Sequence, residues 1–163
     1  MVRYDSLRLL TALSISLGWQ QPDQLDIKGA FLYGYLNEEI YMRLPPGNDV
    51  PGSCAPLNKS IYGLKQAPRQ WYQRLTGFLT PLGFMTTNFD PCVLIHKDCL
   101  LIIAIYVDDI TIAGSSGKYR DSQKKSLKSE FDLSDLGPLN WLLGIQVEWH
   151  ENSAILSQHA YID

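Results

Sequence analysis

Two adjacent carboxylates, Asp108 and Asp109, interrupt the longest apolar stretch of this chain, which runs from residue 100 to residue 114. The β-branched and other apolar residues on both sides predict two buried strands joined by a tight turn that carries the acids. Because an unpaired charge is costly inside a protein, the pair must be either solvated at the turn or neutralised by a cation. An ordinary hairpin with an Asp-Asp turn is the more frequent meaning of this pattern. The rest of the chain decides between the two.

Length and composition narrow the class of protein. A chain of 163 residues, 45% of them hydrophobic, predicts one domain with a substantial core. No apolar run reaches the ~18 to 20 residues of a membrane-spanning helix, and the N-terminus lacks the apolar segment of a signal peptide, so we expect a soluble, intracellular protein. The three cysteines suggest reduced thiols, because their number is odd and no Cys-x-x-Cys spacing occurs. A net charge of -3 implies that any nucleic-acid surface is a local patch or is completed elsewhere.

Three segments have the periodicity of helices. We expect helices over residues 6–17, with a cap at Asp5 or Ser6 and Gly18 as a stop, over residues 68–82, and over residues 117–131. The last of these carries the main basic cluster, which we interpret as a solvated helix face rather than a phosphate site. Its members are Lys118, Arg120, Lys124, Lys125 and Lys128.

The remaining segments predict strands and turns. Strands are expected over 24–27, 37–44, 92–96, 99–107 and 110–113, followed by a hairpin from 141–149 and 154–158. Residues 45–56 and 132–138 predict a loop and a turn, because proline, glycine and other turn residues recur there. In an antiparallel sheet, the strand that ends at Asp26 could lie beside the hairpin of Asp108 and Asp109, which makes Asp26 a third acid of one site.

Three clustered carboxylates invite divalent cations. At roughly 4 Å and an effective dielectric of ~20, each like-charged pair costs about 4 kcal/mol. Carboxylate oxygens with open positions suit Mg²⁺, and two such ions stabilise the attacking and leaving oxygens of a phosphoryl displacement. The candidate chemistries are therefore those of polymerases, nucleases and cyclases.

The motifs of the chain, in their order, resemble the reverse transcriptase domain of copia-type LTR retrotransposons. Residues 26–34 are similar to the first palm motif, and residues 36–47 to its usual continuation. Residues 57–72 are similar to the second motif, which distinguishes the copia type. Tyr106-Val107-Asp108-Asp109 matches the polymerase signature, and residues 136–145 match the segment after it.

The resemblance implies a fold and a metal site. The implied fold is an α+β polymerase palm, with a central antiparallel sheet that carries the acids and is backed on one face by the three helices, with incomplete fingers and no thumb. Asp26 and Asp108 would hold two Mg²⁺ ions, for which Mn²⁺ could substitute. The carbonyl of Ile27 would assist with the nucleotide-bound ion, and Asp109 would balance charge.

The resemblance also implies substrates and partners: deoxynucleoside triphosphates, an RNA or DNA template with its primer, and the rest of a Pol polyprotein, but no membrane. Phe31, Tyr62 and Gly63 match nucleotide-binding positions, although a core aromatic is the plain interpretation of Phe31. Template or primer contacts are implied for Lys65, Tyr106, Leu143 and Gly144. The implied location is the cytoplasm, within a virus-like particle, or the nucleus.

Two departures from the family qualify these expectations. Ser134 stands where family members usually have a lysine, a candidate proton donor to the leaving pyrophosphate. The upstream fingers, the thumb and the ribonuclease H are absent from residues 1–163, so we expect a single palm-centred domain with weak or no activity alone. A non-catalytic remnant that binds nucleic acid or a protein is the alternative. A nucleotide cyclase is a distant third hypothesis, because it has no need of residues 62–72.

Overall fold

The computed structural model describes residues 1–47 and 52–162, apart from the side chains of residues 160 and 161. The chain forms two compact units. The core unit comprises Met1–Lys28 and Thr80–Asp163, and the inserted unit comprises Gly29–Leu79. The middle of the loop predicted over 45–56 lies outside the described residues. Among the described residues, no helix combines the length and apolar character needed to cross a membrane.

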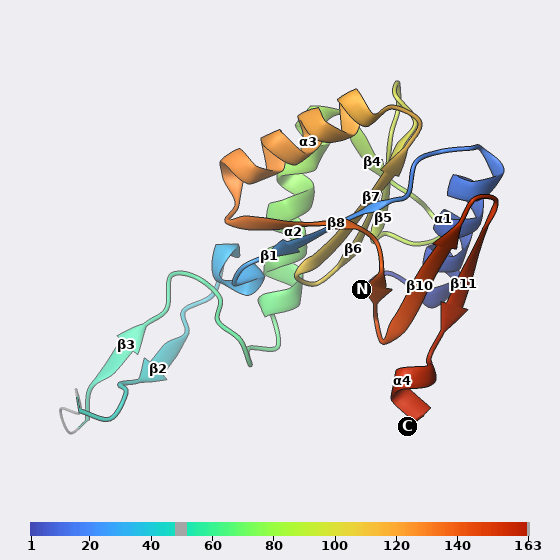
Figure 1. The fold of residues 1–163 in the computed structure, drawn as a ribbon. Helices are drawn as coiled ribbons and strands as arrows, with labels where there is room; N and C mark the ends of the chain where they lie inside the picture. The colour runs from blue at the N-terminus through green and yellow to red at the C-terminus, as the bar shows by residue number, and fades with distance from the viewer. Residues whose placement is uncertain (48–51, 163) are drawn as a thin grey trace. The chain divides into compact units, whose positions relative to one another are not determined.

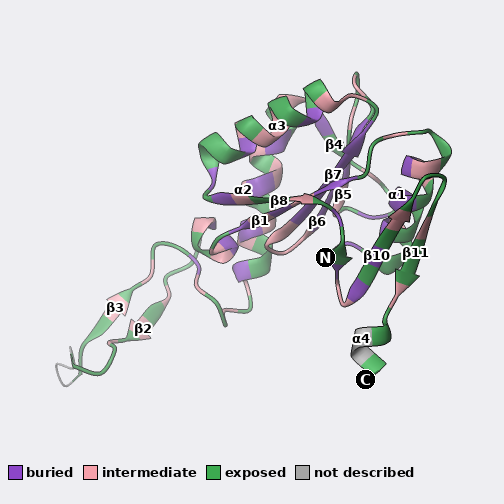
Figure 2. Ribbon diagram, viewed as in Figure 1, coloured by how far each residue is buried: buried purple, intermediate pink, exposed green. Residues whose placement is uncertain are grey.

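A six-stranded antiparallel sheet forms the centre of the core unit (Figure 1). Its strands, in spatial order, are β4 (Phe84–Thr86), β5 (Val93–His96), β6 (Leu101–Tyr106), β7 (Asp109–Gly114), β1 (Asp23–Ile27) and β8 (Leu133–Pro138). Buried residues concentrate on the middle strands (Figure 2). The predicted central antiparallel sheet and its meander around Asp108 are confirmed, and β4 is an additional strand.

Strand β8 occupies the place where a turn was predicted over 132–138, so that prediction was wrong. Asp26 lies opposite Ser134, and Ile27 lies opposite Leu133, which is only 6% exposed. The register shifts between Gln24 and Leu25, so β8 contains a bulge. An edge strand tolerates the glycine and proline that made this segment resemble a turn.

Helix α3 (Gly117–Glu130) is tied to the face of β1 that carries Asp23. Lys124 Nζ lies 2.9 Å from Asp23 Oδ2 and 3.0 Å from Asp135 Oδ2. Arg120 is 6% exposed and donates to the carbonyl of Gln21 at 2.7 Å. The solvated-face interpretation was therefore wrong for Arg120 and Lys124, which fasten the helix to the sheet.

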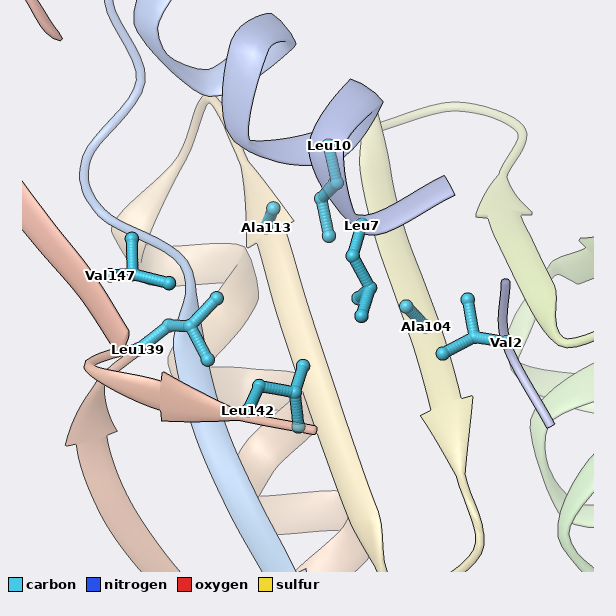
Figure 3. Close-up of a cluster of buried hydrophobic side chains, with 8 residues drawn as sticks. All are labelled: Val2, Leu7, Leu10, Ala104, Ala113, Leu139, Leu142 and Val147. Carbon is cyan, nitrogen blue, oxygen red and sulfur yellow. The ribbon is translucent and has the colours of Figure 1, made fainter. Parts of the chain in front are cut away.

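Helix α1 (Tyr4–Ser16) covers the opposite face of the sheet. Figure 3 shows Leu7 and Leu10 of this helix pointing toward Ala104 and Ala113 of the sheet. Side chains alternate along β7, so Ala113 and Asp109 lie on the same face of the sheet. The opposite face carries Asp23 and contacts α3. The prediction that the helices back one face was therefore wrong, because α1 and α3 lie on different faces.

The N-terminus of α1 differs from the predicted capping by Asp5 or Ser6. The helix begins after Arg3, and no side-chain hydrogen bond from its N-cap residue closes it. Instead, the carboxylate of Asp90 accepts hydrogen bonds from Arg3 N at 2.9 Å and Ser6 Oγ at 2.6 Å. The predicted stop at Gly18 is confirmed, since Gly18 has a φ of 62°.

A second sheet, of three antiparallel strands, follows β8. It comprises β9 (Trp141–Leu142), β10 (Ile145–His150) and β11 (Ser153–Ser157), and α4 (His159–Ile162) comes after it. The predicted hairpin is confirmed, but its first strand is divided by a turn at Leu143 and Gly144, which have φ values of 56° and 73°. Leu139, Leu142 and Val147 complete the apolar cluster under α1 (Figure 3).

The inserted unit contains η1 (Ala30–Tyr33), the paired strands β2 (Tyr41–Arg43) and β3 (Cys54–Pro56), and α2 (Ala67–Leu79). Helix α2 buries residues at helical spacing, namely Ala67, Trp71, Leu75 and Leu79. It is shorter than predicted, because residues 80–82 form the short helix η2 of the core unit. Of the strand predicted over 37–44, only the part over β2 forms a strand. The last residues of the loop predicted over 45–56 form β3.

Candidate active site

The core unit places the three predicted acids at one end of neighbouring strands. Asp26, near the end of β1, lies directly opposite Asp109, the first residue of β7. Tyr106 lies opposite Asp109 on the other side, at the end of β6. The backbone N–H of Ile27 donates to the carbonyl of Asp108 at 2.8 Å, which joins β1 to the turn between β6 and β7.

That turn is tight and strained. Tyr106 and Asp109 pair across it, so Val107 and Asp108 form a two-residue connection. Val107 has a φ of 53°, a conformation that costs a β-branched residue roughly 1–2 kcal/mol. Such strain persists only where the surrounding strands enforce it, and it is frequent at functional sites.

Electrostatic repulsion marks the cluster. Burial raises the pKa of Asp109 above its usual value, and the negative charges of Asp26 and Asp108 raise it further. A hydrogen bond from Gln24 Nε2 to Asp109 Oδ1, 3.2 Å long, opposes this rise in pKa. The negative charges of Asp26 and Asp108 therefore act on the carboxyl group of Asp109.

The donor set suits a hard divalent cation, because it consists of carboxylate oxygens with a nearby backbone carbonyl. Within the described part of the chain, however, no group of three or more His, Cys, Asp or Glu side chains is arranged so that it could hold a metal ion. Asp26 and Asp109 are neighbours in the sheet, but among the described residues their side chains belong to no group that could hold a metal ion.

The other predicted positions of the core unit lie on the same sheet or in the turn between β9 and β10. Ser134, at the position where the resemblance implies a lysine, lies opposite Asp26 on β8 and borders the acidic cluster. Leu143 and Gly144 form the turn between β9 and β10, and the hydroxyl of Tyr4 donates to the carbonyl of Leu143 at 3.0 Å.

The inserted unit holds the predicted nucleotide-binding positions. The rings of Phe31 and Tyr62 contact each other, with centroids 4.8 Å apart and planes tilted by 56°. Gly63 has a φ of 93°, which a side chain would make unfavourable, and Lys65 is exposed. The candidate residues thus form two sets, one in each unit.

Gln24 contacts the acidic cluster and was not among the predicted site residues. Its hydrogen bond to Asp109 depends on the pairing of β1 with β7, which puts Gln24 and Asp109 on one face. The available signal was the alternation in Gln24-Leu25-Asp26-Ile27, since residues two apart in a strand share a face.

Comparisons with known proteins agree with the motifs. The family described as "Reverse transcriptase (RNA-dependent DNA polymerase)" matches residues 1–163. The Pol polyprotein of transposon TNT 1-94 from Nicotiana tabacum is 40% identical over 171 residues, which cover 100% of this chain and 13% of that protein. The Pol polyprotein of transposon RE1 from Arabidopsis thaliana is 34% identical, over 99% of this chain and 11% of its own length.

A more distant relative is the Ty1-DR4 Gag-Pol polyprotein of Saccharomyces cerevisiae, 32% identical over 76% of this chain and 8% of that protein. The chain thus spans only a small part of the polyproteins it matches. The resemblance to copia-type elements is confirmed, and the chain belongs to the reverse transcriptase (RNA-dependent DNA polymerase) family.

Proposed function

We propose that this chain carries the catalytic face of an RNA-directed DNA polymerase that adds deoxynucleotides to a primer 3′ end. The observation that supports this most directly is the pairing of Asp26 with Asp109, beside Asp108, on neighbouring strands. Burial of Asp109 and the neighbouring charges of Asp26 and Asp108 raise the pKa of its carboxyl group, and a bound cation would offset both effects.

Members of this family generally use divalent metal ions, and we assign the ligands here to Asp26, Asp108 and the carbonyl of Ile27. Asp109 would balance the charge of the bound ions. Two Mg²⁺ ions, or Mn²⁺ in their place, would supply Lewis-acid stabilisation of the attacking and leaving oxygens. The hydrogen bond from Ile27 N to Asp108 O would keep β1 and the turn in place when the ions are bound.

The substrates would be recognised by the remaining positions. Phe31, Tyr62 and Gly63 would form a nucleotide-binding surface, for which the contact between the two rings and the open backbone of Gly63 give support. Contacts with template or primer are proposed for Lys65, Tyr106, Leu143 and Gly144. In the full polyprotein, other segments would complete the hold on nucleic acid.

Primer extension on poly(rA)/oligo(dT) with Mg²⁺ tests the proposal. We expect the unmodified chain to incorporate dTMP weakly at most, and we expect Asp108→Asn and Asp109→Asn to abolish that incorporation, whereas Asp98→Asn, in the exposed turn before β6, should preserve it. Nucleic-acid binding that survives in the Asp108→Asn protein, without any incorporation by the unmodified chain, would instead support a binding remnant. Incorporation that survives both catalytic substitutions would refute the proposal.

A further inference from the structure

Gln24 lies in β1 two residues before Asp26, on the same face of the sheet. Its register partners are Thr111 on β7 and Gly137 on β8. The side chain reaches past Thr111 to Asp109, and its Nε2 donates to Oδ1 at 3.2 Å. An ionised carboxylate can only accept, so the nitrogen of the carboxamide must face it.

The neighbours of Gln24 make this contact specific. Thr111 is 1% exposed, and among the described residues its buried hydroxyl has no hydrogen-bond partner. The carboxamide of Gln24 therefore bonds to Asp109 and not to Thr111, the polar residue directly opposite it. Gly137 presents no side chain on the other side, so the contact with Asp109 is not imposed by crowding from β8.

We propose that Gln24 is a positioning residue for the metal site, an inference that rests on the proposed polymerase function. It fixes one oxygen of Asp109 and leaves the second oxygen available to the cluster. Because the carboxamide is neutral, it orients the acid without lowering the net negative charge that attracts a divalent cation. A lysine at this position would also hold Asp109, but its charge would compete with that cation.

Substitutions of Gln24 can therefore distinguish its effect on the orientation of Asp109 from the effect of a charge at this position. Asp109 is assigned to charge balance and not to coordination, so Gln24 acts one residue away from the proposed ligands, and its contribution should lie at the lower end of the roughly 10- to 100-fold that is typical of groups orienting a metal ligand. Gln24→Met has nearly the same length and cannot donate, so we expect it to weaken Mn²⁺ binding about tenfold. Gln24→Lys should weaken Mn²⁺ binding at least as much while leaving the metal-free thermal midpoint equal or higher.

The experiment measures Mn²⁺ binding to the 163-residue chain by electron paramagnetic resonance, with thermal melts in EDTA to establish folding. Gln146→Met, at an exposed position of β10, is the matched control and should bind like the unmodified chain. Asp108→Asn identifies the site. If Asp108→Asn abolishes binding and Gln24→Met leaves it unchanged, the inference about Gln24 is wrong and the proposed function stands. If the unmodified chain shows no Mn²⁺ binding sensitive to Asp108→Asn, both are wrong.

A second measurement needs no substitution. In ¹⁵N-labelled chain titrated with Mg²⁺, the side-chain amide resonance of Gln24 should shift together with the backbone resonances of Asp108 and Asp109. The side-chain amide of Gln146 should not shift. Shifts of the acidic residues without any change at the Gln24 amide would overturn the inference, even if Gln24→Met failed to fold.

Discussion

Removal of the Asp90 carboxylate should detach the start of α1 from the loop between β4 and β5. Asp90 is 5% exposed and accepts three hydrogen bonds. Two come from the start of α1, at Arg3 N and Ser6 Oγ, and the third comes from Cys92 N at 3.0 Å. The N-cap residue of α1 forms no side-chain hydrogen bond with the helix, so the carboxylate of Asp90 takes the place of such a cap, although it lies 87 residues from Arg3 in the sequence.

The magnitude follows from the contacts. A hydrogen bond contributes about 1 kcal/mol net, so three of them predict that Asp90→Ala lowers the free energy of unfolding by about 3 kcal/mol. The favourable position of a negative charge at a helix N-terminus acts in the same direction. Asp90→Asn retains one acceptor oxygen and should cost roughly half as much as Asp90→Ala.

Urea unfolding followed by circular dichroism at 222 nm measures this difference, with Asp98→Ala at an exposed turn as the control. Burial by itself raises the pKa of Asp90, but the hydrogen bonds from Ser6, Arg3 and Cys92 together hold it below its ordinary value of 3.8. The ionised group therefore stabilises the fold above pH 3.8, and this stabilisation is lost as the pH falls through the lower, folded-state pKa. A loss no larger than that of Asp98→Ala, or one independent of pH in this acid range, would refute the reasoning.

Two further predictions concern the acidic cluster and the inserted unit. Because the folded-state pKa of Asp109 is raised, its ionisation opposes folding at neutral pH, so Asp109→Asn should raise the metal-free thermal midpoint. This gain should disappear as the pH falls below 3.8, where the carboxyl is protonated in both states; an unchanged midpoint at pH 7 would contradict it. Gly34→Ala should destabilise by roughly 1–3 kcal/mol, because a Cβ there would lie 2.8 Å from Gln70 Cβ and from Ser60 Oγ. A Cβ at Gly77 in α2 would have no neighbour within 4 Å, so Gly77→Ala should instead raise the free energy of unfolding by about 1 kcal/mol. Equal effects of the two substitutions in urea unfolding would contradict the close packing described around Gly34.

Local pattern was sufficient where side-chain alternation and chemistry agreed. The apolar runs around Asp108 predicted β6, β7 and the tight turn, and the strand before Asp26 was recognised from its own sequence. Their pairing followed because few arrangements of an antiparallel sheet bring the acids together. The helices were located within a few residues, since their apolar spacing and terminal residues are local signals.

Features that depend on distant partners could not be predicted in this way. Strand β8 has the composition of a turn, and it is a strand because the edge of β1 is available to it. Arg120 and Lys124 look like surface residues in a basic helix, and only the position of Asp23 shows that they are anchors. The placement of α1 on the face opposite α3 likewise depends on the pairing of β6 with β7, which puts the small side chains of Ala104 and Ala113 on one face, where Leu7 and Leu10 can pack against them.

The position of β1 between β7 and β8 has a consequence for the order of folding. The hairpin of β6 and β7 is local, whereas β1 must close long loops to reach either neighbour. Loop closure is an entropic barrier that only later contacts offset, so β1 should dock after the hairpin has formed. The acids therefore meet late, and a cation bound among them would stabilise the native state more than the folding transition state. Such an ion would act mainly by slowing unfolding.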